Sequence, residues 1–457
     1  MSQYTINNQI IHVQESGRDD APLAVLIHGW SSSSFTWQTI LPTLNQRYHC
    51  IAVDLPGFGK SPAPAKTPTI AWYAELIDAL IEHFSPERPA LVLGHSMGGQ
   101  ITATLALNHS SNVEQIILLN PSLSGRLSTR VGLLLAPHVY AERNPFIEWL
   151  LFMLAKTPLD YTDKLLKPSN FAERAKLSDD HYTHIRSDAR RRGQGRMRAY
   201  AYRAIRDGDL RGSLGRIDIP ALVIWGAEDN VVPLRDAGLV AQEWPRADLR
   251  IIPNAGHWPQ FEQTDATLLH IRNFLGLPPM IPGQEPVTNN LEKLRETAVF
   301  LNNTEIGRNL SESQRLRLAS LLHSRGYAPN EEIATMDADG HEMYVVMDGQ
   351  LDVIVRDTNA APVVLASVGR SQVAGELSLL DGSPRSAELR AGAQGVTLLT
   401  LTREGLVTLA QDDTQMGMQV MQNLAISLGK RLRNQNTRAM KIDQEQQNKR
   451  KQPVLYA

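Results

Sequence analysis

The sequence has one cysteine, no surplus of positive charge and no long apolar run. Cys50 has no second cysteine in the chain to pair with, which excludes an internal disulfide and fits a reducing compartment. The formal net charge of -2 argues against non-specific electrostatic binding of nucleic acid. No apolar run reaches the roughly 18 residues of a membrane-spanning helix, and the nearest, Phe146–Leu154, contains Glu148. The first residues have neither a basic region nor an apolar core, so we expect no signal peptide, no transmembrane segment and a cytoplasmic location.

Residues 1–277 alternate short apolar runs with amphipathic stretches. We expect a β-hairpin over residues 1–20 and buried strands over 23–27, 48–53, 89–93, 115–119, 221–225 and 249–252. Helices are expected between them, over 69–84, 98–109, 234–244 and 262–275. Buried strands that alternate with helices predict an α/β fold with a mostly parallel sheet, in which ligands bind at the carboxyl ends of the strands.

One turn between a strand and a helix has the pattern Gly-x-Ser-x-Gly, with Ser96 at its centre. The two glycines let the backbone reverse sharply, which lifts the serine onto the tip of the turn in a strained conformation. A serine alone is a poor nucleophile, because it needs a base and the base needs an orienting acid. His257 and Asp229, each of which follows one of the last two expected strands, are the candidates for these roles.

These residues carry a resemblance to the α/β-hydrolase fold over about residues 1–277. Its motifs in this chain are His28-Gly29-Trp30, Asp54-Leu55-Pro56-Gly57-x-Gly59-x-Ser61, Gly94-His95-Ser96-Met97-Gly98-Gly99, Gly226-Ala227-Glu228-Asp229 and Gly256-His257. The resemblance implies a catalytic triad of Ser96, Asp229 and His257. It places the oxyanion hole on the backbone amides of Trp30 and Met97, and it implies acyl transfer without a metal or another cofactor for catalysis.

The acid of the triad has competitors in the sequence. Glu228 directly precedes Asp229 and Asp236 follows it, although the family's position matches Asp229. Some relatives carry the acid after the strand expected at 115–119, where this chain has Asn120. An amide has no charge with which to hold an imidazolium, so we expect the acid at Asp229.

An insertion over about residues 121–216 is expected to form a helical cap over the site, as the resemblance implies. Its apolar stretches, Leu133–Leu135 and Phe146–Leu154, are read as the packed interior of the cap, with an acyl-binding wall or a lipid-facing lid as the alternative. Its arginines are read as a solvated helix face, with contact to an anionic group or to the second domain as the alternative. They are Arg190, Arg191, Arg192, Arg196, Arg198, Arg203 and Arg206.

A proline-rich stretch over residues 278–290 predicts a semi-rigid linker, and the pattern changes after it. Helices are expected over 290–300 and 311–324, short strands over 343–347, 351–355, 363–368 and 396–401, and a long helix over 415–441. Turn signals such as Asp348-Gly349 separate the strands. Residues 291–440 therefore predict a small β-barrel or jelly roll with flanking helices, and residues 441–457 a polar, disordered tail.

The segment from Gly375 to Ala387 opens a short helix with small residues and exposed amides, which suits an anion. It is similar to the phosphate-binding cassette of cyclic-nucleotide-binding domains, and that resemblance covers about residues 295–435. The resemblance implies that Glu376 holds the ribose 2′-hydroxyl and Arg385 the cyclic phosphate. The expected nucleotide-binding residues are Gly375, Glu376, Leu377, Ser378, Arg385 and Ser386. Ser386 leaves cAMP and cGMP both open, with cAMP preferred.

The sequence thus predicts a serine hydrolase of carboxylic esters that is regulated by cAMP or cGMP. Its expected partners are a small-molecule ester, lipid-like if the cap is a lid, and the cyclic nucleotide. No room remains for a helix-turn-helix after Arg433, so no nucleic acid partner is expected. A C–C bond hydrolase or an acyltransferase on the same triad, a non-catalytic nucleotide-responsive binding protein, and a homodimer through the C-terminal helix stay open.

Overall fold

The computed structural model describes residues 2–129, 132–133, 141, 144–154, 171–172, 177–189, 191, 193–277, 291–356 and 361–451. The chain divides into two compact units, Met1–Ile271 and Arg272–Ala457. The division falls slightly before the boundary expected at residue 277. The linker expected at 278–290 lies outside the described residues.

The first unit is built on an eight-stranded sheet, in the order β1-β2-β4-β3-β5-β6-β7-β8. Its strands are β1 Ser2–Ile6, β2 Gln9–Ser16, β3 Leu23–Ile27, β4 His49–Asp54, β5 Ala90–His95, β6 Val113–Leu119, β7 Ala221–Gly226 and β8 Ala247–Ile252. The hairpin β1–β2 is antiparallel and β2 pairs antiparallel with β4, whereas the strands from β4 to β8 in this order pair in parallel. This confirms the mostly parallel sheet.

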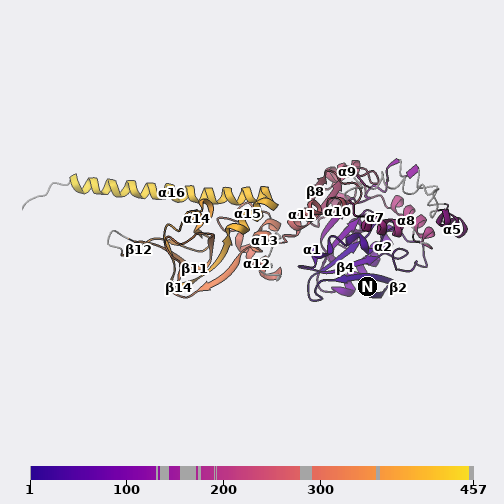
Figure 1. The fold of residues 1–457 in the computed structure, drawn as a ribbon, viewed down its shortest axis with the longest axis horizontal. Helices are drawn as coiled ribbons and strands as arrows, with labels where there is room; N and C mark the ends of the chain where they lie inside the picture. The colour runs from indigo at the N-terminus through magenta and orange to yellow at the C-terminus, as the bar shows by residue number, and fades with distance from the viewer. Residues whose placement is uncertain are drawn as a thin grey trace, which may run out of the picture. The chain divides into compact units, whose positions relative to one another are not determined.

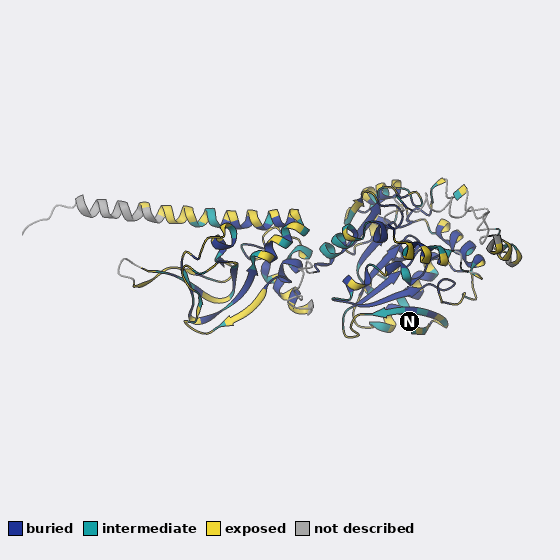
Figure 2. Ribbon diagram, viewed as in Figure 1, coloured by how far each residue is buried: buried dark blue, intermediate teal, exposed yellow. Residues whose placement is uncertain are grey.

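Every residue of β3, β4, β5 and β7 is buried, as Figure 2 shows by the dark blue centre of this unit. Continuous burial is typical of parallel strands that are covered by helices on both faces. The covering elements include α1 Leu41–Leu44, α2 Ile70–Phe84, α3 Met97–Asn108, α9 Arg235–Glu243, α10 Pro259–Glu262 and α11 Thr264–Leu275, with short 3-10 turns at Ser34–Trp37, Ser110–Asn112 and Leu214–Arg216. The single helix expected over 262–275 is two, because Gln263 adopts a non-helical conformation at the end of α10.

The described part of the cap is mostly helical, with α5 Pro145–Leu154, α7 Asp179–Ala189 and α8 Gly195–Asp207 (Figure 1). The apolar side chains of α5 were expected inside the cap, but Phe146, Trp149, Leu150 and Met153 are exposed. Arg203 and Arg206 are exposed as expected, whereas Arg198 is buried. Leu134, Leu135, Arg190 and Arg192 lie outside the described residues.

The second unit combines helices with a six-stranded antiparallel sheet. Its strands are β9 His323–Tyr327, β10 Glu332–Ala334, β11 Glu342–Arg356, β12 Pro362–Val368, β13 Val373–Ala374 and β14 Glu388–Thr402. Its helices are α12 Leu291–Leu301, α13 Glu312–Ala319, α14 Glu376–Asp381, α15 Arg403–Asp412 and α16 Thr414–Lys451. The expected capping box at the start of α13 is present, with Ser311 and Gln314 as its members.

Four expectations for this unit need correction. The strand pairing does not close into a barrel among the described strands. The turn expected at Asp348-Gly349 lies within β11, where the register shifts while β14 pairs on both sides, so the chain bends instead of reversing. The helix expected to reach residue 324 ends at Ala319, because His323–Tyr327 pairs with β14. The long helix continues past Lys441 to Lys451, into the segment expected to be disordered, and residues 452–457 lie outside the described residues.

Candidate functional site

Ser96 lies at the junction of β5 and α3, with a φ of 54° that few residues other than glycine adopt. Its backbone N–H donates to the carbonyl oxygen of Leu119, 3.0 Å away, which ties the turn to the end of β6. The flanking glycines are required by space. A Cβ at Gly94 would lie 2.3 Å from the carbonyl oxygen of Gly98, and one at Gly98 would lie 2.1 Å from that of Ile27.

His257 and Asp229 meet at the carboxyl ends of β8 and β7. The two side chains are almost fully buried, and Nδ1 of His257 lies 2.8 Å from Oδ2 of Asp229. Oδ1 of Asp229 accepts hydrogen bonds from the backbone amides of Val231 and Val232, at 2.7 and 3.0 Å. These bonds hold the carboxylate in one orientation, so that the far nitrogen of the imidazole is left for proton transfer. The catalytic roles of the three residues stay predictions.

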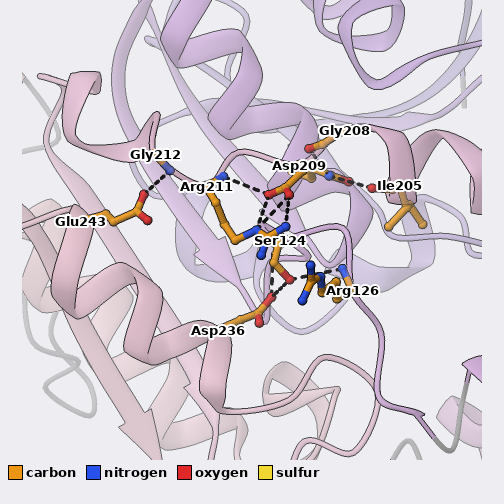
Figure 3. A network of polar contacts seen from close by, with 10 residues as sticks. Ser124, Arg126, Ile205, Gly208, Asp209, Arg211, Gly212, Asp236 and Glu243 are labelled. Atoms are coloured by element: carbon orange, nitrogen blue, oxygen red, sulfur yellow. Dashed lines mark hydrogen bonds and ion pairs between the residues drawn. The ribbon is translucent and has the colours of Figure 1, made fainter.

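The two competing acids are engaged elsewhere. Glu228 accepts a hydrogen bond from the amide of Ala255 at 3.1 Å. Oδ2 of Asp236 accepts from the Ser124 hydroxyl at 2.6 Å, within the polar network of Figure 3 that also contains the Asp209–Arg211 pair. Burial raises the pKa of the Asp236 carboxyl, and the hydrogen bonds from Ser124 oppose that rise. Among the described residues, Asp229 is therefore the acid bonded to His257.

Two buried side chains that the sequence reasoning missed support this pair. Asn120 donates from Nδ2 to Oδ2 of Asp229 at 2.5 Å. Oε1 of Glu262 accepts from the amides of Gly256 and Trp258, at 2.9 and 3.2 Å, and so braces the loop on both sides of His257. The position of Asn120 was noted only as a place without an acid, and nothing in the spacing of Glu262 identified its role.

His95, the residue before Ser96, packs its ring against His257 with the centroids 4.9 Å apart. Burial, followed by the charge of His257, holds the pKa of His95 well below its usual range. The ring is therefore neutral, and its Nε2–H donates to the carbonyl oxygen of His257, 2.8 Å away. A neutral His95 thus supports the His257 backbone without competing for its proton.

The segment expected to supply the oxyanion hole passes beside Ser96. A Cβ at Gly29 would lie 3.0 Å from the Cβ of Ser96. The next residue, Trp30, donates from its indole to the carbonyl oxygen of Arg198 in α8, at 2.9 Å. Met97 is the first residue of α3 and is fully buried, so its amide belongs to the helix N-terminus. The two amides stay candidates for the oxyanion hole.

An aromatic cluster joins the cap helix α7 to the segments near Trp30 and His257. Phe35 stacks on His184 of α7, with the ring centroids 4.2 Å apart. The buried members of the cluster are Phe171, Leu177, Tyr182, Ile185, Trp258 and Phe261. This part of the cap is therefore apolar where it approaches the loop that carries His257.

In the second unit, Arg385 is held against the residues that open α14. It donates to the carbonyl oxygens of Gly375 and Glu342, at 3.2 and 2.7 Å, and its guanidinium lies over the ring of Tyr344. Gly375 has a φ of 78°, and a Cβ there would lie 2.3 Å from Nη1 of Arg385. Nε of Arg385 is buried and has no partner among the described residues. The guanidinium is thus fixed in place with donor capacity left.

Glu376, the first residue of α14, is paired with Arg431 of α16, at 2.7 Å between Oε1 and Nη1. Arg431 also contacts Glu305 at 3.0 Å and the carbonyl oxygen of Val373 at 2.5 Å. Burial raises the pKa of Glu376, and the charge of Arg431 opposes the rise. The sequence reasoning missed Arg431, because an arginine in a long helix gives no sign of a partner 55 residues earlier in the chain.

The remaining expected nucleotide residues surround this pair of charges. Ser378 is buried and its hydroxyl lies 3.4 Å from the carbonyl oxygen of Pro384. Leu377 and Ser386 are exposed, Leu377 by 50%. Gly375, Glu376 and Arg385 are thus brought together, while their roles toward a nucleotide stay predictions.

Two negative findings concern only the part of the chain that the structure describes. None of its helices combines the length and the apolar composition needed to cross a bilayer. Within the same residues, no group of three or more His, Cys, Asp or Glu side chains is arranged to hold a metal ion.

Comparison with known proteins separates the same two regions. Residues 22–264 match the alpha/beta hydrolase fold, and residues 324–413 match the cyclic nucleotide-binding domain. Three curated relatives are similar to the first region.

An uncharacterized hydrolase, YugF, of Bacillus subtilis (strain 168) is 28% identical over 59% of this chain and 94% of its own length. A pimeloyl-[acyl-carrier protein] methyl ester esterase of Aeromonas hydrophila is 30% identical over 56% of this chain and 96% of its own length. A 2-hydroxy-6-oxononadienedioate/2-hydroxy-6-oxononatrienedioate hydrolase of a Pseudomonas species is 28% identical, over 59% and 92%. Each relative is similar to little more than half of this chain.

Proposed function

The chain belongs to the α/β-hydrolase fold family and contains a cyclic nucleotide-binding domain, and from that premise we propose that it is a serine hydrolase of carboxylic esters that responds to cAMP or cGMP. The observation that carries the proposal is the buried hydrogen bond between Asp229 and His257, next to the strained turn of Ser96. Chain order also fits, because Ser, Asp and His follow one another as in this fold.

In the proposed reaction, Oγ of Ser96 attacks the ester carbonyl carbon while Nε2 of His257 takes the hydroxyl proton. The amides of Trp30 and Met97 donate to the oxyanion that forms. His257 then gives the proton to the leaving alcohol, and the acyl group stays on Ser96. Water, deprotonated by His257, attacks this acyl-enzyme and releases the carboxylic acid. Asp229 keeps Nδ1–H oriented and stabilises the imidazolium throughout.

An ester with an apolar acyl part is the preferred substrate. The aromatic cluster of α7, Trp258 and Phe261 supports an apolar acyl site, and one curated relative carries the name of a methyl ester esterase. A second relative bears the name of an oxo-dienedioate hydrolase, so C–C bond hydrolysis on the same triad is the second candidate. Acyl transfer to an alcohol in place of water uses the same acyl-enzyme. It would appear as a new ester product whose yield depends on the added alcohol.

The test combines a fluorophosphonate probe, which labels activated serines, with p-nitrophenyl esters of graded chain length. Wild-type protein is expected to be labelled and to hydrolyse the esters. Ser96→Ala should lose both, while Ser110→Ala, an exposed serine in the same unit, should keep both. Labelling without ester turnover would move the proposal to the C–C hydrolase. Absence of labelling would leave a non-catalytic nucleotide-responsive protein.

The nucleotide proposal rests on Glu376 and Arg385 of the second unit. Arg385 is positioned to hold the cyclic phosphate, with Gly375, Leu377, Ser378 and Ser386 around it. The ribose hydroxyl would compete with Arg431 for Glu376, and so binding would act on α16. Titration calorimetry with cAMP and cGMP tests this, with Arg385→Ala expected to abolish binding and to keep basal ester hydrolysis. Arg356→Ala, in a strand of the same unit, is the control.

A homodimer through α16 completes the proposal. Met418, Met421, Ala425, Leu428 and Leu432 recur at alternating spacings of three and four residues, the pattern of a coiled-coil seam. Met418, Met421 and Leu432 are exposed, by 69%, 44% and 59%. A second copy of the same helix is the occupant that fits a seam of this period. The proposed location is the cytoplasm, in keeping with the single cysteine.

A further inference from the structure

Asn120 is a fully buried amide that contacts three segments of the candidate active site. Its Nδ2 donates to Asp229 and to the carbonyl oxygen of Gly256, at 2.5 and 3.3 Å. Its Oδ1 accepts from the amide of Gly226 at 3.4 Å. One side chain thus connects the end of β7, the acid itself and the residue before His257.

The oxygen that Asn120 contacts is the one that holds the base. Oδ2 of Asp229 receives Nδ2–H of Asn120 and, at 2.8 Å, Nδ1 of His257. The other carboxylate oxygen receives the two amides of Val231 and Val232. Among the described residues, no lysine or arginine joins these donors. The negative charge of Asp229 is therefore shared between neutral N–H groups and the imidazole.

We propose that Asn120 is a positioning residue of the triad, which orients Asp229 and limits how tightly its Oδ2 holds the imidazolium of His257. The inference rests on the proposed serine hydrolase. A carboxylate oxygen that loses a donor becomes a stronger acceptor. It then binds the charged imidazole more tightly, and the base gives up its proton less readily to the leaving group.

The backbone of Asn120 permits a clean test. Its φ is 45°, and its N–H donates to the carbonyl oxygen of Ile224 at 2.9 Å. Asn120→Gly removes the amide group and keeps a residue that tolerates this conformation. Asn254 is the matched control, because it is also left-handed, with a φ of 58°, but its side chain is exposed. Asn120→Asp is the conservative variant, since its protonated form donates to Asp229 in place of the amide.

The experiment measures the inactivation rate by a fluorophosphonate, and kcat/KM for p-nitrophenyl butyrate, as functions of pH. For Asn120→Gly we expect both rates at pH 7.5 to fall by about tenfold or more, because displaced catalytic groups lose rate steeply. The acidic limb should move to higher pH, because a more tightly held imidazolium loses its proton later. Asn254→Gly should match wild type in both respects.

Asn120→Asp should recover rate at low pH and lose it as pH rises, because two buried carboxylates cannot both stay charged cheaply. Thermal melting by circular dichroism identifies variants that do not fold. If Asn120→Gly does not fold, the comparison with wild type is made with Asn120→Asp. An unchanged rate and pH profile in Asn120→Gly would overturn the inference. So would a loss of rate with an unmoved acidic limb and no recovery in Asn120→Asp, which is the signature of a merely structural residue. A wild type that does not react with the probe would overturn the proposed function itself.

Discussion

Two buried histidines, His28 and His95, lie near the candidate nucleophile, and their protonation affects the stability of the first unit. Besides His95, His28 is fully buried, and burial lowers its pKa. Its Nε2 accepts from the amide of Leu55 at 3.0 Å, so Nδ1 carries the proton that is shared with the carbonyl oxygen of Gly29. Both rings are neutral in the folded protein, and protonating either would bury a positive charge.

The pH dependence of stability follows from these two lowered pKa values. A histidine whose folded pKa is depressed binds fewer protons folded than unfolded, so its stabilising effect is complete above the unfolded pKa of about 6.5 and is lost as pH falls below it. We expect the urea midpoint of the wild-type protein to fall between pH 7.5 and pH 5.5. His95→Gln, which cannot be protonated, should flatten the fall, and exposed His83→Gln should leave it unchanged. Parallel curves for all three proteins would contradict the assignment.

At the scale of elements, α16 has two apolar faces with different partners. Met416, Val420 and Leu424 are buried in the core of the second unit, together with Leu379 of α14. Of the seam residues, Met418, Met421 and Leu432 are exposed, and none of the three belongs to this core. The same helix therefore packs into the domain core and leaves an apolar seam, for which a second copy is the proposed partner. Figure 1 shows α16 extending along the sheet beside α14 and α15.

A charge in the exposed seam should separate the proposed dimer. We expect Met421→Glu with Leu432→Glu to sediment as a monomer where the wild type sediments as a dimer, because a buried unpaired carboxylate is costly in an apolar seam. Gln422→Glu, which adds a charge to the same helix beside the seam, is the control. Analytical ultracentrifugation gives the result, and a monomeric wild type at all concentrations would refute the dimer.

The whole molecule combines a hydrolase domain and a cyclic nucleotide-binding domain on one chain. Each of the two units has its own core. Regulation then requires that the nucleotide favour one of two states that differ in affinity for the ester. Coupling of this kind is reciprocal, so it has a signature that does not depend on which state is active.

Any coupling between the ester and the nucleotide should have the same size in both directions. Ser96→Ala is expected to bind the ester without turning it over, and in this variant a saturating ester should change the Kd of the nucleotide. The factor should equal the one by which nucleotide changes the Kd of the ester, since both come from one coupling free energy. Calorimetric titration in both orders measures the two factors. Nucleotide binding that is indifferent to the ester, in a protein whose ester affinity the nucleotide changes, would exclude a direct thermodynamic link.

Features that depend on neighbouring residues could be predicted from the sequence. Continuous apolar runs indicated the parallel strands, and the glycines around Ser96 indicated a turn too crowded for a Cβ. The identity of the second domain followed from a local segment in the same way, because Glu376 and Arg385 lie close together in the chain.

Other contacts between distant residues became visible only in the folded chain. Asn120 reaches Asp229 across 109 positions of the chain, and Arg431 reaches Glu376 across 55. The helix expected up to residue 324 gave way to β9 because pairing with β14 outweighs local preference. Hydrogen bonds of this kind depend on where a fold places a side chain, and one sequence without its fold contains no trace of that placement.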